Sequence, residues 1–233
     1  MKFTHVTLEN CTTAKGIVVV IDVLRAFTTA AFAFAAGAER IVLVGEVEEA
    51  LAWRRRDHQA LLMGEVGGLH IPGFDFGNSP AEIETQDLRG RRLIQRTSSG
   101  TQGIILSHNA QTLLAASFCV AGATVRFLQQ LAPEGVTFVS TGVRADGRGD
   151  EDVACAEYLE AILKGQRPNP QPYLDRVRNS VNGRIFADPH RPEFPSADLE
   201  RSLRLDAFHF AMPVYLHAGD WVMTAVPNQA PVT

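Results

Sequence analysis

The chain contains 233 residues, and its 22 basic and 26 acidic side chains give a formal net charge of −4. Hydrophobic residues make up 45% and charged residues 21%. This composition is ordinary for a globular protein, and it excludes a disordered chain, a collagen-like fibre and a strongly basic nucleic-acid binder. A chain of this length can bury a hydrophobic core without metal or disulfide cross-links.

The number of cysteines and the hydropathy of the sequence indicate in which cellular compartment the protein is located. The cysteines stand far apart, at Cys11, Cys119 and Cys155. They form no CxxC pair, so neither a disulfide framework nor a structural zinc site is expected. The longest apolar stretch, residues 17–38, contains Asp22 and Arg25, and each charge near a bilayer centre would cost roughly 3 kcal/mol. The first 15 residues lack the order of a signal peptide. We therefore expect a cytoplasmic protein with no membrane partner.

Apolar segments of strand length alternate with helical patterns through the first 165 residues. Residues 17–23 are β-branched and nearly continuous, as expected of a strand buried on both faces. Further strands are predicted at residues 41–44, 60–63, 93–95, 113–118 and 136–140. Helices are predicted at residues 26–36, 47–57, 123–130 and 150–164. This alternation predicts an α/β fold, a layered α/β/α sandwich with a largely parallel or mixed sheet.

The character of the sequence changes after Gly165, where prolines concentrate in residues 167–172 and 188–195. This part also holds two short helical patterns and an apolar tail, at residues 173–179, 196–205 and 208–226. We therefore divide the chain into a main α/β domain, residues 1–165, and residues 166–233. The latter form a C-terminal α/β extension or a small second domain packed on the main one.

Ligands of open α/β sheets bind outside the carboxyl ends of the strands, so the turns that follow strands are the places to inspect. In the first such turn, Asp22 lies near the end of a strongly apolar strand, where an unpartnered carboxylate would be costly. Pairing with Arg25 or binding a metal ion would remove that cost, and both remain open. Thr28 follows in the next helix, where its hydroxyl either bonds to the backbone or belongs to the site.

The second polar region consists of residues 64–68 (GEVGG) and 73–82 (GFDFGNSPAE). Its glycines allow the backbone to approach a ligand closely. The SPAE segment has the pattern of a capping box with proline at the first helical position, which predicts a helix N-terminus that favours phosphate or carboxylate. The alternative is a surface loop whose glycines and Ser79 satisfy turn geometry. The loop length and the glycines favour a functional role.

The third region, residues 96–101 (RTSSGT), follows the strand predicted at residues 93–95. Hydroxyl groups around a glycine, next to Arg96, suit the binding of an oxyanion, although the same residues are common in turns. The segment is neither a Walker A loop nor a GxSxG nucleophile elbow. It therefore supports anion binding only together with the other regions.

The fourth region, residues 142–152, is a glycine-bearing loop that enters the predicted helix at residue 150. It carries four carboxylates, at Asp146, Asp150, Glu151 and Asp152. Grouped oxygen ligands suit a hard cation such as Mg²⁺, whereas the spacing excludes an EF-hand. The alternative is that these acids stabilise the helix N-terminus through the helix dipole.

Taken in order, these segments resemble the ComB family, the Mg²⁺-dependent 2-phosphosulfolactate phosphatases. The similar segments are IDVLRAFTTA from Ile21, GEVGG from Gly64, GFDFGNSPAE from Gly73, RTSSGT from Arg96 and the acidic helix start at residues 150–152. The most specific element is GFDxGNSP following GExxG. Two segments depart from the usual family pattern: SSGT replaces Thr-Asn-Gly-Thr at residues 98–101, and STG replaces Cys-Ala-Gly at residues 140–142.

The resemblance implies an enzyme of coenzyme M biosynthesis that hydrolyses the phosphate monoester of a small, multiply anionic acid. The expected catalytic residues are Asp22, Arg25, Glu65 and Asp75. The expected magnesium ligands are Asp22, Glu151 and Asp152. Substrate and phosphate are expected to contact Thr28, Gly68, Asn78, Ser79, Arg96, Ser99, Gly100 and Thr101.

Several alternatives stay open at this point. The chain is expected to use a metal-activated water, since the DxD signature of many phosphoaspartate enzymes is absent after Asp22. A phosphatase for another phosphorylated hydroxy acid and a non-catalytic binder of an anionic metabolite are the two rival functions. The apolar stretch from Phe27 to Phe34 and the C-terminal tail make a homodimer an expectation as well.

Overall fold

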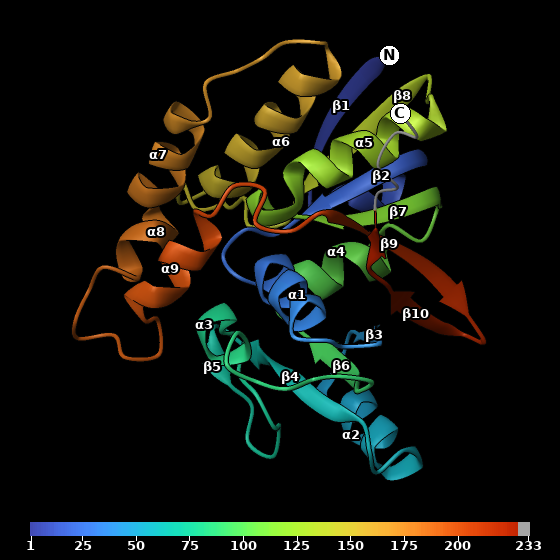
Figure 1. Ribbon diagram of the computed structural model, residues 1–233, viewed down its shortest axis with the longest axis vertical. Coiled ribbons are helices and arrows are strands. Elements are labelled where there is room, and N and C mark those ends of the chain that lie inside the picture. Colours follow the sequence, from blue (N-terminus) through green and yellow to red (C-terminus); the bar gives the residue numbers. More distant parts are fainter. Residues whose placement is uncertain (228–233) are drawn as a thin grey trace.

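The computed structural model describes residues 1–227 (Figure 1). Its strands are β1 (Lys2–Thr7), β2 (Gly16–Ile21), β3 (Arg40–Val44), β4 (Leu61–Val66), β5 (Leu69–His70), β6 (Arg92–Arg96), β7 (Ala110–Ala116), β8 (Gly135–Ser140), β9 (Phe210–His217), β10 (Asp220–Met223) and β11 (Val226–Pro227). Its α-helices are α1 (Ala26–Ala35), α2 (Val47–Arg56), α3 (Pro80–Ile83), α4 (Gly100–Leu106), α5 (Ala121–Leu131), α6 (Asp150–Leu163), α7 (Gln171–Asn179), α8 (Val181–Ile185) and α9 (Ser196–Ser202). The predicted layered α/β sandwich is confirmed.

The sheet consists of two parallel groups of strands joined by an antiparallel hairpin. Its order is β1-β8-β2-β7-β9-β10-β3-β6-β4-β5, and β11 pairs with β9. Strands β1, β8, β2 and β7 run parallel to one another, as do β3, β6 and β4. Between the two groups, β9 pairs antiparallel with β7, and β10 pairs antiparallel with β3. Figure 1 shows this hairpin between the two groups of strands.

Side chains alternate between the two faces of the sheet, as the strand period requires. Val18 and Val20 of β2 pack in the same cluster as residues of α1 and α4, whereas Val19 and Ile21 pack with residues of α5 and α6 on the opposite face. Helix α2 covers that opposite face over β3, β4 and β6. Helix α1 is buried from Ala26 to Phe34, so it has no polar face turned to solvent. The stretch from Phe27 to Phe34, which had suggested a homodimer, is therefore buried within the core of this chain.

The predicted helices and strands of the first 165 residues occur close to their expected bounds, and the structure adds further elements. The polar N-terminal segment forms the edge strand β1, which pairs in register with β8 from Lys2↔Gly135 to Thr7↔Ser140. The RTSSGT segment continues into helix α4. The apolar tail supplies β9 and β10 to the sheet interior, while the division of the chain at residue 165 stays a prediction. No helix in residues 1–227 combines the length and the hydrophobicity that a membrane span requires.

The position of the hairpin between β7 and β3 leads to a stability prediction. Met223 of β10 is fully buried in the cluster that also contains Val214 of β9. Met223→Ala should therefore lower the free energy of unfolding by about 2–4 kcal/mol, because it leaves a cavity in the core. Urea denaturation measures this change.

The matched control for Met223→Ala is Leu216→Ala in the same hairpin, because Leu216 is 59% exposed. Its effect should stay within about 0.5 kcal/mol. Equal effects of the two substitutions would contradict the placement of the hairpin inside the sheet.

Candidate active site

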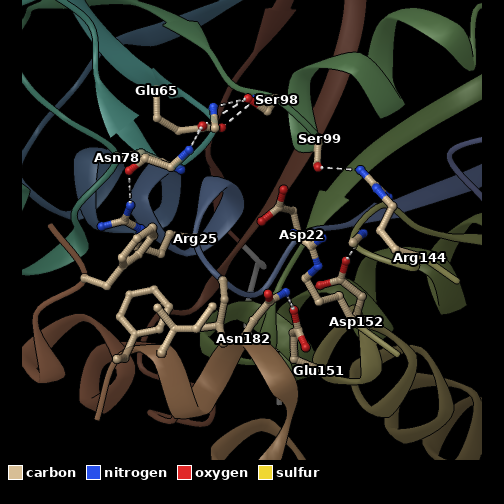
Figure 2. Close-up of a pocket in the computed structure, with 18 of the residues that line it drawn as sticks. Asp22, Arg25, Glu65, Asn78, Ser98, Ser99, Arg144, Glu151, Asp152 and Asn182 are labelled. Carbon is tan, nitrogen blue, oxygen red and sulfur yellow. Dashed lines mark hydrogen bonds between the residues drawn. The ribbon is translucent and has the colours of Figure 1, made fainter. Parts of the chain in front are cut away.

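A pocket of about 300 Å³ opens where several parallel strands end. Asp22 follows β2, Glu65 lies near the end of β4, Ser98 and Ser99 follow β6, and Gly142 follows β8. The N-terminus of α6 and residues 182–194 complete its wall (Figure 2). The pocket thus occupies the crevice expected for an α/β sheet.

Asp22 is a buried carboxylate directly after β2 and is only 6% exposed. Its Oδ1 accepts a hydrogen bond from the Ala26 N–H at 2.9 Å, and its Oδ2 lies 3.3 Å from the Thr141 hydroxyl. Burial, together with the charges of Glu65 and Glu151, raises the pKa of Asp22 to about 6, although the hydrogen bonds from Ala26 and Thr141 act in the opposite direction. Near neutral pH this carboxylate is ionised and able to accept a proton.

Gly100, at the start of α4, lies directly against this carboxylate. A Cβ at this position would lie 2.9 Å from Asp22 Oδ2 and 2.6 Å from the Ala26 Cβ. Only glycine therefore allows α4 to approach Asp22 this closely. The residue packs behind the site, whereas it was predicted to bind substrate.

Asp152 joins the ends of two neighbouring strands through its carboxylate. Its Oδ1 accepts the Val23 N–H at 2.8 Å, and its Oδ2 accepts the Gly142 N–H at 2.7 Å. Burial raises the pKa of Asp152 well above its ordinary value, and the charges of Asp22 and Glu151 add to that effect. Asp152 therefore holds the loops after β2 and β8 together, on the floor of the pocket.

Glu151 has one bonded and one free carboxylate oxygen. The side chain is 1% exposed, and its Oε1 accepts a hydrogen bond from Asn182 Nδ2 at 2.6 Å. Its Oε2 has no partner within residues 1–227. A buried oxygen without a partner is costly unless a ligand or water completes it, so Glu151 is a candidate ligand for a cation.

Glu65 links the ends of β4 and β6 in the same manner. Its Oε1 accepts the Ser98 N–H at 2.5 Å, and its Oε2 accepts the Gly68 N–H at 2.6 Å and the Ser98 hydroxyl at 3.0 Å. Figure 2 shows Glu65 and Ser98 bonded at one side of the pocket, and Glu151 and Asn182 bonded on the other. The two sides of the pocket thus each present a buried carboxylate.

One open prediction was that Arg25 pairs with Asp22. The structure instead pairs Arg25 with Asp198, in the C-terminal part of the chain. Its Nη1 donates to Asp198 Oδ2 at 2.9 Å, and its Nη2 donates to the Gly68 carbonyl at 3.0 Å. Its guanidinium also lies over the rings of Phe186 and Phe194, at 5.3 and 5.1 Å from their centres. Arg25 lines the pocket, and it holds the segment before α9 against the β4–β5 turn.

The helix N-terminus predicted at Ser79 exists, and a carboxylate of the chain itself occupies it. Ser79 caps α3 by accepting the Glu82 N–H at 3.2 Å. Asp198 Oδ1 accepts the Ser79 hydroxyl at 2.6 Å and the Ala81 N–H at 3.1 Å. The expected preference of this N-terminus for an anion is therefore met by Asp198, and Ser79 does not reach the pocket.

Arg96 and Thr101 fix the turn after β6, whereas both were predicted to contact substrate. Arg96 donates to the carbonyl oxygens of Gly45 and Glu65 at 3.1 and 3.0 Å. The Thr101 hydroxyl bonds to the Thr97 carbonyl at 2.9 Å and accepts the Thr97 N–H at the same distance. Neither side chain lines the pocket.

Asp75 and Thr28 also lie outside the pocket. The Asp75 carboxylate accepts the Leu62 N–H at 2.7 Å and forms an ion pair with Arg54. The Thr28 hydroxyl donates to the Val23 carbonyl at 2.8 Å, in line with the alternative that it bonds to the backbone. Their contacts stabilise the strand ends and the first turn of α1.

The structure thus brings together part of the predicted site. The predicted residues that line the pocket are Asp22, Arg25, Glu65, Gly68, Asn78, Ser99, Glu151 and Asp152. Pocket residues that sequence reasoning missed include Arg144, Arg148, Asn182, Phe186, Arg191 and Phe194. The first two stand in the acidic fourth region, where the arginines themselves were a usable signal. The others belong to the proline-rich part, where no motif marked them.

The comparisons with known proteins agree with the resemblance noted in the sequence. The sequence profile described as 2-phosphosulpholactate phosphatase matches residues 3–179. The chain belongs to this family. A Bacillus subtilis (strain 168) protein named probable 2-phosphosulfolactate phosphatase is 35% identical over 182 residues, which cover 78% of this chain and 79% of that protein.

Two further relatives of the family carry the same name. The protein from Carboxydothermus hydrogenoformans is 41% identical over 150 residues, 64% of this chain and 61% of its own length. The protein from Deinococcus radiodurans is 42% identical over 155 residues, 63% of this chain and 62% of its own length. The chain therefore spans about three fifths of these two relatives.

Some of the residues that line the pocket lie within the region matched to the family, and others lie after it. Residues 3–179 include all four buried carboxylates of the site, Asp22, Glu65, Glu151 and Asp152. The pocket wall from Asn182 to Phe194 follows the matched region. The carboxylate floor thus belongs to the family match, and this wall lies outside it.

The raised pKa of Asp22 leads to a prediction about stability and pH. In EDTA at pH 7, Asp22→Asn should raise the free energy of unfolding by roughly 2–3 kcal/mol, because it removes a buried charge while keeping the shape. Folded Asp22 binds its proton more tightly than the unfolded chain does. The gain should therefore shrink as the pH falls below about 6, and it should vanish only below about pH 3.8, where Asp22 is protonated in both states.

Chemical denaturation of both proteins across this pH range measures the effect of Asp22→Asn. Asp75→Asn is the matched control, because it removes a carboxylate that has both an ion-pair partner and a backbone donor. It should destabilise the protein at pH 7. A destabilising effect of Asp22→Asn at pH 7 would contradict the cost assigned to its charge.

Proposed function

We propose that this protein hydrolyses the phosphate monoester of 2-phosphosulfolactate to sulfolactate and phosphate, in a Mg²⁺-dependent reaction in the cytoplasm. The observation that carries this proposal is the position of the four buried carboxylates and of several arginines around one pocket of the family-matched region. The relatives' names supply the substrate. A phosphate ester that carries further acidic groups needs both a cation and positive side chains at its site.

The oxygen donors of the floor fit a magnesium ion. Among the described residues, Glu151 Oε2 has no hydrogen-bond partner, and Asp22 Oδ2 has a polar contact with the Thr141 hydroxyl at 3.3 Å. Both oxygens of Asp152 already accept backbone N–H groups. Within residues 1–227, no three acidic, histidine or cysteine side chains form a metal-binding group. This agrees with the usual mode of Mg²⁺, which one or two carboxylates hold together with water and substrate phosphate.

Asp22 and Glu151 would therefore hold the ion, and Asp152 would keep both in place. A bound Mg²⁺ would offset the negative charge of the phosphoryl oxygens and lower the pKa of a nearby water. The attacking water gives its proton to solvent, because the Asp22 carboxylate would be engaged by the ion. The bond from phosphorus to the substrate oxygen then breaks, and that oxygen takes a proton from solvent.

The aromatic rings at the mouth reduce the access of water. Phe186 and Phe194 line the pocket, pack edge to face with ring centroids 5.4 Å apart, and both contact the Arg25 guanidinium. The ion pair of Arg25 with Asp198, whose side chains are 5% and 0% exposed, keeps this wall closed over the site. A drier pocket strengthens the interaction of its charged groups with the substrate.

The first test of this function is phosphate release from 2-phosphosulfolactate and from a panel of other phosphorylated hydroxy acids. The wild-type protein should release phosphate with Mg²⁺ and not with EDTA, with 2-phosphosulfolactate preferred. Glu151→Gln should lower the rate by about 100-fold, because it weakens a metal ligand. The matched control Glu157→Gln changes an exposed residue of the same helix and should keep the rate.

Each outcome of the panel identifies one function. Preference for another panel member would retain the reaction and replace the substrate, which is relevant because the wall from Asn182 to Phe194 lies beyond the family match. Tight binding of phosphate without turnover of any member would identify a binding protein. Equal rates for Glu151→Gln and Glu157→Gln would contradict the role of Glu151.

The metal is tested separately by thermal unfolding without substrate. At about 100 times its Kd, Mg²⁺ should raise the Tm of the wild-type protein by about 5 °C, because it binds only the folded state. It should shift the Tm of Asp22→Asn and Glu151→Gln far less. A shift of the same size in these variants would exclude Asp22 and Glu151 as the ligands.

A further inference from the structure

The pocket arginines differ in one respect, the presence of an acidic partner. Arg25 pairs with Asp198, Arg148 with Asp146, and Arg191 with Glu193. The remaining pocket arginine, Arg144, has no ion pair with any carboxylate in residues 1–227. Its positive charge is therefore free to meet a negative charge brought by a ligand.

Arg144 is nevertheless held firmly by neutral groups. Its Nη1 donates to the carbonyl oxygens of Thr141 and Val143 at 2.8 and 2.7 Å, and its Nη2 donates to the Ser99 hydroxyl at 3.1 Å. These acceptors orient the guanidinium without neutralising it. An arginine fixed in this way loses little conformational entropy when it binds an anion.

The anchors of Arg144 place it beside the acidic floor. The Thr141 hydroxyl lies 3.3 Å from Asp22 Oδ2 and 3.5 Å from Asp152 Oδ2, and Ser99 precedes the Gly100 that packs on Asp22. Figure 2 shows the hydrogen bond between Ser99 and Arg144 at the side of the pocket where Asp22 lies. A ligand group that contacts Arg144 would therefore also lie next to Asp22, which the proposed function assigns to the metal ion.

We propose that Arg144 binds the phosphoryl group of the substrate and stabilises the charge on its oxygens during transfer, with Ser99 as the residue that positions it. This inference deepens the proposed function and rests on it for the identity of the ester. Arg148 and Arg191, which keep acidic partners and lie partly exposed, are less suited to this role.

Arg144 takes no proton during the reaction. The water oxygen forms a bond to phosphorus, and the bond from phosphorus to the substrate oxygen breaks. One water proton passes to solvent, and the substrate oxygen takes one proton from solvent. The N–H groups of Arg144 bond to non-transferring oxygens of the phosphoryl group, where negative charge is concentrated.

The test combines binding of inorganic phosphate with kinetics. Arg144→Ala should weaken phosphate binding in calorimetry by about 10-fold or more, and it should lower kcat by about 100-fold in the substrate assay. Added guanidinium should restore part of the lost rate. Arg144→Lys should recover less than a tenth of the wild-type rate, because an ammonium has three N–H donors and cannot bond the three neutral anchors and the phosphoryl group at once.

The positioning role of Ser99 and the matched control are measured in the same experiments. Ser99→Ala should reduce kcat less than Arg144→Ala does, and it should not respond to guanidinium, since Arg144 remains. The exposed Arg184, outside the pocket, provides the control, and Arg184→Ala should bind phosphate like the wild-type protein. Far-ultraviolet circular dichroism and Tm establish that each variant is folded.

Loss of phosphate binding in Arg144→Ala, in a protein that turns over no ester, would support the assignment of Arg144 and reject the proposed function. Wild-type phosphate affinity in Arg144→Ala, together with normal turnover, would overturn the assignment of Arg144 and keep the proposed function. Equal losses in Arg144→Ala and Arg184→Ala would show a general effect of charge and would also overturn the assignment.

Discussion

Mutual repulsion among buried carboxylates is the constraint on which the other features of this structure depend. Asp22, Glu65, Glu151 and Asp152 lie around one pocket with little exposure to water. Burying a single unpaired charge is costly, and burying several together is more so. Within residues 1–227, the chain offsets this cost with backbone N–H groups, the Asn182 amide and hydroxyl groups, and not with arginine partners.

These donors determine how the strand ends are arranged. Each N–H that reaches Asp152 or Glu65 comes from a loop at the end of a different strand, after β2, β4, β6 and β8. The carboxylates can therefore be held only while those loops keep their positions. The same contacts that limit the electrostatic cost thus make the pocket rigid, which favours a reaction that depends on positioning.

Positive charge is arranged around this floor in two different ways. Arg25 is neutralised by Asp198, and it connects the wall with the β4–β5 turn. Arg144 is held by carbonyl and hydroxyl groups that leave its charge in place. Two arginines of one pocket therefore differ in their partners, and the partner decides whether an arginine stabilises the fold or remains available to an anion.

The residues that were predictable from the sequence are those whose local surroundings reveal them. Asp22 stands at the end of an apolar strand, and Asp152 stands at the start of a helix, so a polar site at both was expected. The pairing of Arg25 with Asp198 was not predictable, since 173 positions separate the two residues. Arg144 stands in a polar loop, and only its three-dimensional contacts distinguish it from a solvated side chain.

The strands, like the site residues, were predictable only where the local sequence carries a signal. The β2 segment is apolar because both of its faces are covered, and it was predicted correctly. Strand β1 is a polar edge strand with a single neighbour, and its sequence lacks that signal. The apolar tail indicated burial, but nothing in it indicates that β9 and β10 lie between β7 and β3.

The place of this hairpin has a consequence for the order in which the protein folds during synthesis. Residues 210–223 leave the ribosome after both groups of parallel strands. Until then, β7 lacks its neighbour β9 and β3 lacks its neighbour β10, and the strand edges that they present are open to association with other chains. Asp22 belongs to one group of strands and Glu65 to the other. Glu151 and Asp152 belong to the same group as Asp22. Burial of the hairpin, which carries none of the charges of the site, thus completes the sheet between three of the carboxylates and the fourth.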